Sequence, residues 1–361
     1  MLRTRLTELL DIEHPLVQAP MAGSSTPELA AAVSAAGGLG SLPCAFLEPD
    51  GIRAAVREVR ARTSRPFNLN FFCHATPLVD PAALDRWQQR LAPYYEELGL
   101  EPPAEPPPVR RAFDEAACEV VLETAPAVVS FHFGLPDAAL LRRLAQSGCR
   151  ILASATTVAE ARWLAGQGCD AVIAQGAEAG GHRGIFLTDD VATQAGAIAL
   201  VPQVVDAVDV PVIAAGGIGD ARGIAAALAL GAAGVQLGTS FLRCAETGLP
   251  QLYRRVLAEA GDDTTVVTNV FTGRPARGIA NRLAREVGPL AGDAPPFPLA
   301  AAAVAPLRAA AERSGSADFS AFLFGQAAAL GRELPAGELV ETLMREAAEI
   351  LRGLPGTLLS A

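Results

Sequence analysis

Apolar runs and amphipathic segments alternate along the chain from near its start to about residue 245. Each run is rich in Val, Ile, Leu, Ala or Phe and ends at Gly, Pro or a polar residue, as strands buried on both faces do. Segments with helical periodicity follow most runs, and several open on Ser, Thr, Asp or Pro, which commonly start helices. The pattern predicts eight strands, within 15–23, 38–42, 66–73, 127–133, 150–155, 170–174, 211–215 and 234–239.

The spacing of these strands and helices is that of repeated β–α units. Eight units that close on themselves form an α/β (β/α)8 TIM barrel, the fold class predicted here, and an open doubly wound sheet is the alternative. After the third strand the repeat is interrupted by a helical pattern near 87–98 and a proline-rich stretch at 101–108, which we expect to be extended. We therefore expect a barrel formed by 1–75 and 126–245, an insertion at 76–125, and a C-terminal helical accessory region at 246–361 that closes the barrel mouth.

Composition excludes several classes of function. Half of the 361 residues are hydrophobic and 19% are charged, which suffices for a large core. All 29 basic residues are Arg, so a lysine Schiff base and a P-loop lysine are excluded. The net charge of −10 argues against nucleic acid as a partner. The chain lacks a long uncharged apolar run, and acidic residues occupy its first turns, so we predict a cytoplasmic protein without a membrane partner. Homo-oligomerisation is left open.

The six cysteines and four histidines do not have the spacing of a metal site. The cysteines lie far apart without a C-x-x-C pair, so we expect neither a zinc site nor a disulfide framework. Most are interpreted as small buried side chains of a reducing compartment. The histidines show no H-E-x-x-H or comparable motif. We therefore predict no bound metal.

The segment 175–184 is the most distinctive polar stretch, and it directly follows the sixth predicted strand. It reads Gln-Gly-Ala-Glu-Ala-Gly-Gly-His-Arg-Gly, so that four glycines surround His182. Glycine allows positive φ and close approach of the backbone to a ligand. The segment is therefore predicted to bind a ligand beside one titratable side chain. A flexible turn that happens to contain His and Arg is the alternative.

Loops after the strands form the active site in barrels of this class. The predicted strand ends carry Met21, Asn70, His132, the segment 175–184, Gly216-Gly217 and 236–239. The last two groups follow strands seven and eight, where such barrels commonly bind phosphate through backbone N–H groups. Gly217 can expose its amide, and Thr239 and Ser240 can add hydroxyls. A Rossmann interpretation of 217–223 is weaker, because no acidic residue ends the next strand to hold a ribose.

Three polar side chains at the strand ends have more than one interpretation. Asn70 and Gln175 are amides, which suit the polar edge of a planar heterocycle, but they could instead bond to neighbouring loop backbone. His132 lies between two Phe residues on its strand, so a buried core imidazole is the alternative to a ligand contact.

Separate motifs in a fixed order connect these residues to a known family. The motifs are Gln18-Ala-Pro-Met-Ala-Gly23, Asn70, Gln175 with Gly-His-Arg-Gly184, Ala214-Ala-Gly-Gly-Ile218, Gln236-Leu-Gly-Thr239 and Phe324-Gly-Gln326. Together they resemble nitronate monooxygenase, formerly called 2-nitropropane dioxygenase, mainly over residues 15–245. The resemblance implies non-covalent FMN and His182 as the catalytic residue, with His132 contacting substrate. The implied FMN-binding residues are Met21, Asn70, Gln175, Gly180, Gly181, Gly217, Gln236, Leu237, Gly238 and Thr239.

The implied activity is oxidation of alkyl nitronates, and of nitroalkanes if these are accepted, by O2 to a carbonyl compound and nitrite. A histidine can hold the nitronate anion when protonated, or act as a base toward a neutral nitroalkane. An FMN-dependent NAD(P)H:quinone reductase or enoyl reductase is the alternative, and a non-catalytic flavin- or phosphate-binding module is a third. At 296–306 the family carries tyrosines and a lysine, whereas this chain has Phe297 followed by alanines.

Overall fold

Eight parallel strands form the centre of the protein in the computed structural model, which describes residues 2–103 and 112–358. Their order is β1-β9-β8-β6-β5-β4-β3-β2, and Val17 in β1 pairs with Leu39 just before β2, which closes the ring. The predicted (β/α)8 barrel is therefore confirmed. The strands are β1 (Leu16–Gln18), β2 (Gly40–Pro43), β3 (Phe67–Phe72), β4 (Val128–His132), β5 (Arg150–Ala155), β6 (Ala171–Gln175), β8 (Val212–Ala215) and β9 (Gly234–Leu237).

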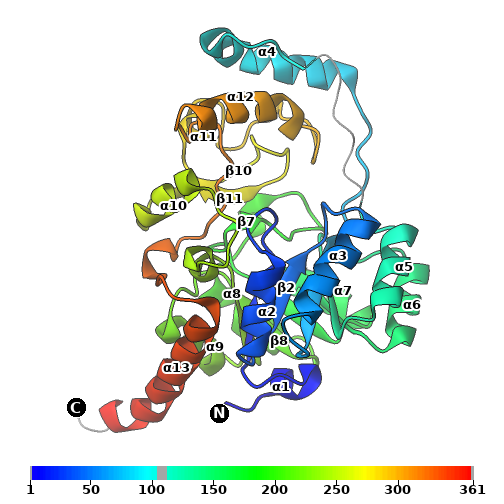
Figure 1. Ribbon diagram of the computed structural model, residues 1–361, viewed down its shortest axis with the longest axis vertical. Helices are drawn as coiled ribbons and strands as arrows, with labels where there is room; N and C mark the ends of the chain where they lie inside the picture. The colour runs from blue at the N-terminus through cyan, green and yellow to red at the C-terminus, as the bar shows by residue number, and fades with distance from the viewer. Residues whose placement is uncertain (1, 104–111, 359–361) are drawn as a thin grey trace.

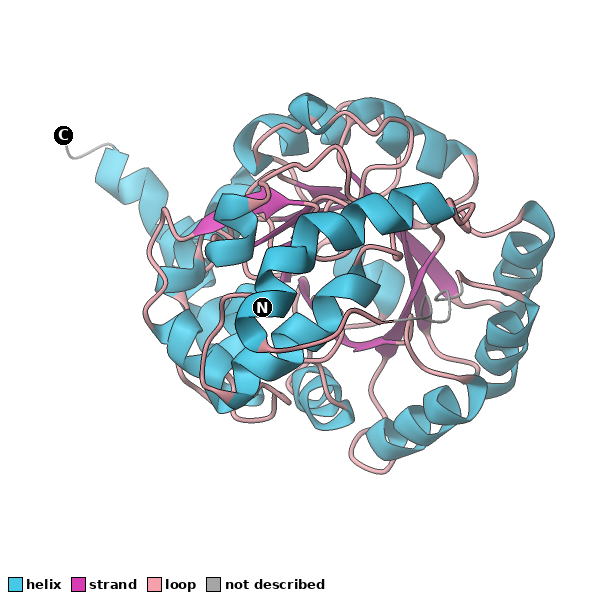
Figure 2. Cartoon of the chain, turned by 90° about the horizontal axis from the view of Figure 1, so that it is seen from above, coloured by secondary structure: helices cyan, strands magenta, loops and turns pink. Residues whose placement is uncertain are grey.

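Helices surround the strands, as the view along the barrel shows (Figure 2). Side chains that cap helix N-termini explain several of the starts, because Thr26, Asp137, Thr157 and Asp220 each accept a hydrogen bond from a backbone N–H of the first turn. The outer helices are α2 (Pro27–Ala35), α3 (Pro49–Arg60), α5 (Glu115–Thr124), α6 (Ala138–Ser147), α7 (Val158–Gly166), α8 (Ala197–Val205) and α9 (Ala221–Ala229).

The strands separate two hydrophobic clusters, because alternate side chains point into the barrel and out toward the helices. Val17, Ile173 and Ile213 are buried inside the barrel together with Leu6 and Leu10 of α1 (Arg5–Leu10). The short N-terminal helix therefore closes the end of the barrel at which the strands begin. In Figure 1 it lies at the bottom of the molecule, opposite the lobe described next.

A separate lobe covers the other end, above the carboxyl ends of the strands (Figure 1). The insertion contributes α4 (Pro81–Leu98), which starts earlier than expected because Asp80 caps it, and Trp87 and Tyr95 pack in a second core. The proline-rich stretch lies largely at 104–111, outside the described residues. The C-terminal part contributes α10 (Gln251–Ala258), α11 (Arg282–Glu286), α12 (Ala301–Arg313) and two strands that were not predicted, β10 (Thr265–Thr268) and β11 (Ala276–Ile279).

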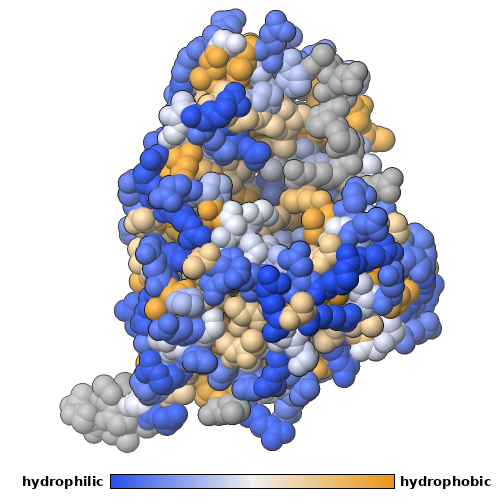
Figure 3. All heavy atoms as spheres, in the orientation of Figure 1, coloured by the Kyte–Doolittle hydropathy of each residue, from blue (hydrophilic) through white to orange (hydrophobic). Residues whose placement is uncertain are grey.

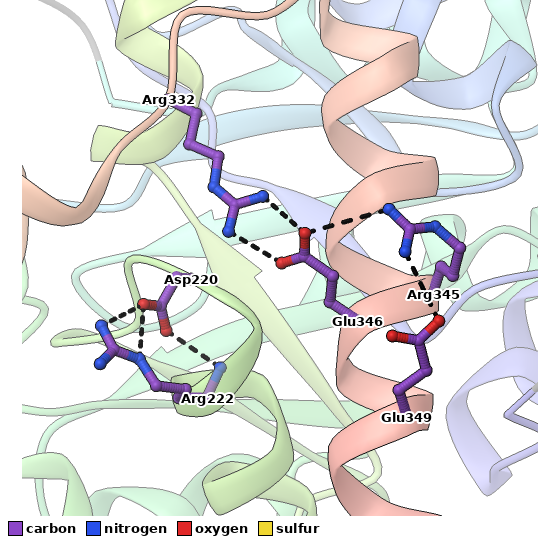
Figure 4. Close-up of polar contacts among 6 residues, drawn as sticks. All are labelled: Asp220, Arg222, Arg332, Arg345, Glu346 and Glu349. Carbon is purple, nitrogen blue, oxygen red and sulfur yellow. Dashed lines mark hydrogen bonds and ion pairs between the residues drawn. The ribbon is translucent and has the colours of Figure 1, made fainter.

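The last helix, α13 (Ala336–Leu358), returns to the outside of the barrel and packs against α9 and α2. Ion pairs line the surface near it: Arg332 contacts Glu346 at 2.7 Å, and Asp220 at the start of α9 pairs with Arg222 (Figure 4). Exposed pairs of this kind contribute little stability, so buried apolar packing holds the helix. The division into barrel, insertion and accessory region stays a proposal.

The visible face of the molecule is mainly hydrophilic, and hydrophobic residues on it form small separate groups (Figure 3). Among the described residues, no helix is long and apolar enough to cross a membrane.

Candidate functional site

The loop that carries His182 is held by strand pairing. After β6, residues Gly181 and His182 form the short strand β7, which pairs antiparallel with β11 through Arg277 and Ala276. Strand β11 in turn pairs with β10, so a distant part of the chain fixes the loop. Gly181 has φ +81°, a conformation that favours glycine. The flexible-turn alternative therefore does not describe this segment.

Two predicted site residues, Gln175 and His132, meet at the carbonyl oxygen of His182. Gln175 Nε2 donates to this oxygen at 3.0 Å, and Gln175 Oε1 accepts from the N–H of Gly184 at 2.7 Å. The His132 Nε2 atom lies 3.1 Å from the same oxygen. Gln175 thus bonds to loop backbone, as the second of its two interpretations expected. Its two hydrogen bonds hold the backbone on both sides of Arg183.

His132 is neutral in this environment. Burial, together with the nearby positive charges of Arg274 and Arg183, lowers the pKa of its imidazole to about 3, against the hydrogen bond to His182, which raises it. A carbonyl oxygen can only accept, so the neutral ring must carry its proton on Nε2 and donate from there. His132 therefore positions His182 directly, and its predicted contact with substrate stays a prediction.

The His182 ring contacts a hydroxyl and several aromatic rings. Its Nε2 lies 2.9 Å from Thr272 Oγ1, whose hydroxyl also lies 3.3 Å from the carbonyl oxygen of Arg274. Ring centroids of Phe297 and Phe133 lie 5.3 Å and 6.0 Å from its own. The imidazole thus has the Thr272 hydroxyl at one ring nitrogen and aromatic rings beside it.

These rings belong to an aromatic cluster that the sequence interpretation did not identify as a unit. The cluster joins the ends of β3 and β4 to the C-terminal lobe. The guanidinium of Arg274 stacks on it, 4.0 Å from the Phe133 centroid. Repeated Phe at the strand ends was the available signal, but it does not show which rings meet. The members are Phe72, His74, His132, Phe133, His182 and Phe297.

Residues 216–219, which we call the glycine turn, follow β8 and, unlike the loop of His182, are not held by strand pairing. Gly216 and Gly217 have φ of +100° and +70°. Among the described residues, the backbone N–H groups of Gly217, Ile218 and Gly219 make no hydrogen bond to another backbone group or to a side chain. Successive unpaired N–H groups of this kind form a concave anion site. The adjacent carboxylate of Glu178 is turned to the N–H of Ala197, at 2.9 Å, at the start of α8.

The turn after β9 adjoins Met21 and a C-terminal segment. A Cβ built on Gly238 would lie 3.6 Å from Met21 Sδ, so the two predicted residues are neighbours. Thr239 Oγ1 accepts from the N–H of Gly325 at 2.9 Å. A Cβ on Gly180 would come within 2.6 Å of the same N–H. The segment 324–326 therefore connects the end of β9 to the loop after β6.

The other predicted residues make contacts that restrict which of their atoms can bind a ligand. Asn70 Nδ2 donates to Ser130 Oγ at 2.9 Å, which leaves its Oδ1 for a ligand. The Leu237 side chain is buried in the outer core, so only its backbone can face a ligand. Ser240 donates to the carbonyl of Gly219 at 3.0 Å, and Gln236 is half-buried.

The fold and these strand ends define a (β/α)8-barrel protein that has, among its described residues, three consecutive unpaired backbone N–H groups after β8 and a histidine beside aromatic rings after β6. Among the residues described, no three His, Cys, Asp or Glu side chains are grouped as metal ligands. The arrangement is suited to a phosphate-bearing organic cofactor and a small substrate beside His182.

Comparison with known proteins identifies the family. The sequence profile of nitronate monooxygenase matches residues 3–346. A nitronate monooxygenase of Paraburkholderia phytofirmans is 47% identical over 94% of both chains. One of Pseudomonas aeruginosa is 45% identical over 95% of this chain and 98% of its own. The solved nitroalkane oxidase of Streptomyces ansochromogenes has a TM-score of 0.87 and 42% identity, covering 97% of this chain and 100% of that one. The chain belongs to the nitronate monooxygenase family and is an oxidoreductase.

Proposed function

We propose that the protein binds FMN and oxidises alkyl nitronates with O2 to a carbonyl compound and nitrite. The observation that carries the cofactor assignment is the glycine turn, whose three consecutive unpaired N–H groups fit a phosphate. A phosphate there replaces water on groups that the protein leaves unbonded. When bound, FMN supplies the redox chemistry, so the protein needs few catalytic side chains.

Each end of the site has a distinct role in this proposal. The glycine turn and the backbone of Gly238 and Thr239 hold the phosphate. The Oδ1 of Asn70 and the side chain of Gln236 are available to the polar edge of the ring system, with Met21 beside it. His182 contacts the nitro group, where it holds the nitronate anion or takes a proton from a neutral nitroalkane.

The aromatic cluster supports a small, partly apolar substrate. Phe133 and Phe297 are almost fully buried and surround the imidazole with apolar surface, which limits access of water. The guanidinium of Arg274 on Phe133 adds a positive charge near the site. Low polarity strengthens the attraction between such a charge and a nitronate anion.

Anaerobic mixing experiments test the assignment. The flavin released on denaturation should be FMN, and propionate 3-nitronate should reduce the flavin absorption bands of the purified protein while NADH and NADPH do not. Bleaching by NADH or NADPH would instead favour the reductase alternative. A flavoprotein that reacts with neither would be a binding module, and release of FAD would contradict the cofactor assignment.

A further inference from the structure

A buried cation and a buried anion lie behind the loop of His182 without touching each other. Arg183 and Glu160 are both 0% exposed, the first directly after His182 and the second in α7. Burial lowers the pKa of Arg183 only to about 10, so its guanidinium is charged at neutral pH. Its nearest oxygen partners are neutral: Gln194 Oε1 and the carbonyl of Gln175, both at 3.0 Å. An isolated buried charge is costly. The carboxylates of Glu178 and Glu160 both offset this cost, because each raises the pKa of Arg183.

Two neutral side chains connect the charges through an unbroken set of hydrogen bonds. Arg183 Nε donates to Gln194 Oε1 at 3.0 Å, Gln194 Nε2 donates to Thr156 Oγ1 at 2.8 Å, and the Thr156 hydroxyl donates to Glu160 Oε2 at 2.7 Å. Arginine only donates and a carboxylate only accepts, so the directions of the amide and the hydroxyl are determined. We call these four residues the Arg183–Glu160 relay. All its dipoles point the same way, and such bonds polarise one another.

The anionic end of the relay anchors the backbone that follows His182. Glu160 Oε1 accepts from the N–H of Phe186 at 2.6 Å and of Leu187 at 3.2 Å. Glu160 Oε2 accepts from the N–H of Thr156 at 2.7 Å as well as from its hydroxyl. Four donors thus surround one buried carboxylate, whose two oxygens accept all four hydrogen bonds. The relay ties the end of β5 to the loop at Arg183 and at residues 186–187.

We propose that Glu160 and Arg183 are positioning residues, whose relay holds residues 182–187 in the conformation that presents His182 to the substrate. The inference rests on the role proposed for His182. Neither residue contacts the imidazole. Arg183 acts through the backbone beside it, and Gln175 grips the same backbone at His182 and Gly184. A buried pair of this kind is a weak source of stability, but removal of one partner leaves an uncompensated charge.

The first test is Glu160→Gln, which keeps the side-chain volume but turns an NH2 group toward N–H donors. We expect kcat for propionate 3-nitronate to fall by about 10-fold, and kcat/KM no further than in a variant without the His182 imidazole, because displacement of a catalytic group costs at most what its removal costs. FMN should stay bound. In the substrate-free protein, amides of 184–187 should exchange hydrogen about 10-fold faster, as measured by mass spectrometry.

A double-mutant cycle tests whether the two charges act as a pair. Arg183→Met and Glu160→Gln each leave one buried charge, so the double variant should lose less kcat than the product of the two single losses. Losses that multiply would show independent residues and would overturn the relay. Glu246→Gln is the matched control, because Glu246 also accepts a backbone N–H, that of Ala336 at 2.8 Å, but lies in a different part of the chain. It should leave kcat and exchange of 184–187 unchanged.

The outcomes separate this inference from the proposed function. If the wild-type protein does not oxidise the nitronate, the proposed function fails, while faster exchange in Glu160→Gln still supports the anchoring of the loop. If the wild-type protein is active, and Glu160→Gln retains its kcat and its protection of 184–187, the positioning role is wrong.

Discussion

The two ends of the candidate site are built in opposite ways. At the glycine turn the binding groups are backbone N–H groups of consecutive residues, and the turn carries no titratable side chain. The aromatic cluster is made of side chains from β3, β4, the loop after β6 and the C-terminal lobe. One end depends on local backbone conformation and the other on tertiary packing. Changes at the two ends should therefore affect different properties, cofactor retention at the first and turnover at the second.

His182→Asn should produce the largest effect. The effect should be on the reaction with substrate and not on retention of the cofactor. A positioned acid or base contributes about 10²–10⁴-fold to rate, so oxidation of any neutral nitroalkane substrate should fall by that order. A preformed nitronate needs no deprotonation, so its kcat/KM should fall less and partly through weaker binding. FMN content should remain at the wild-type level. Steady-state kinetics on both substrates and the flavin absorbance of the same preparation give the comparison.

Thr272→Val is the control for His182, because it removes the hydroxyl 2.9 Å from Nε2 and keeps the imidazole. Its losses should be smaller on both substrates. Similar modest losses for both variants, together with released flavin, would mean that His182 only stabilises the loop. Wild-type activity of His182→Asn on every substrate would remove it from the mechanism.

Gly217→Val should weaken retention of the cofactor, the property that His182→Asn leaves unchanged. Gly217 has φ +70°, where a branched residue is strained by about 1–3 kcal/mol, and its N–H is one of the three unpaired groups. This strain lowers the stability of the folded protein with or without FMN. Displacement of one or two hydrogen bonds to a charged phosphate removes about 3 kcal/mol, which corresponds to roughly 100-fold weaker FMN binding. Fluorescence titration of the flavin-free protein measures this affinity.

Gly148→Val separates backbone strain from the cofactor contact. Gly148 has φ +84°, so valine there carries the same kind of backbone strain, but it ends α6 away from the strand ends that carry the site. Within the described part of the chain, a Cβ on Gly148 would have nothing within 4 Å, whereas one on Gly217 would lie 3.4 Å from the side chain of Glu178. Both variants should lose thermal stability through strain, and only Gly217→Val should lose FMN affinity. Undiminished affinity in Gly217→Val would contradict the assignment of the phosphate to this turn.

The same contrast explains what could be predicted from the sequence. The eight strands were found because each is a short segment rich in apolar residues within a repeat of strands and helices, and the glycine turn because Gly216 and Gly217 are adjacent at a strand end. Both signals are local. Strands β10 and β11 were missed because they lie outside this repeat, and five of their eight residues are only half-buried. Their pairing with β7 was therefore also missed.

Side-chain partners at the site were the least predictable part. Asn70 and Gln175 are predicted to bind the cofactor, and this stays a prediction, but the sequence did not indicate that Asn70 donates to Ser130 and Gln175 to the carbonyl of His182. Those partners lie on a neighbouring strand or depend on the conformation of the glycine-rich loop. The ring of His74, which is not among the predicted site residues, lies 4.9 Å from that of Phe297, more than 200 residues later in the chain. The hydrophobic periodicity of the sequence cannot predict such a contact.

Of the two ends of the site, only the aromatic end should make the free energy of unfolding depend on pH. The pKa of His132 is lowered to about 3 in the folded protein, so below its ordinary value of 6.5 the unfolded chain binds a proton that the folded protein does not. Stability from this residue is complete above pH 6.5 and decreases as the pH falls toward 3. At pH 5 the loss is about 2 kcal/mol. Urea unfolding at pH 7.5 and pH 5 should show this loss in the wild-type protein and a smaller one in His132→Gln.

The substitution also has an internal control. The pKa of His14 is lowered too, chiefly by burial, and its contribution stays in both proteins, so the difference between them isolates His132. Equal pH dependence in the two proteins would show that His132 is hydrated and protonates freely in the folded state.

Phe297→Leu should have the smallest effect and test whether the cluster does more than fill space. The Phe297 ring is 6% exposed and lies 4.9 Å and 5.3 Å from the rings of His74 and His182, and each aromatic pair contributes about 0.5–1.5 kcal/mol beyond burial. Leucine keeps most of the apolar volume, so unfolding free energy should fall by about 1 kcal/mol and kcat/KM by less than about 10-fold, with FMN retained. Phe46→Leu, whose ring is more exposed and contacts Phe72, should leave kcat/KM unchanged. If Phe297→Leu released FMN while turnover of the remaining holoenzyme stayed normal, Phe297 would belong to the cofactor end, and the division of the site into two independent ends would be wrong.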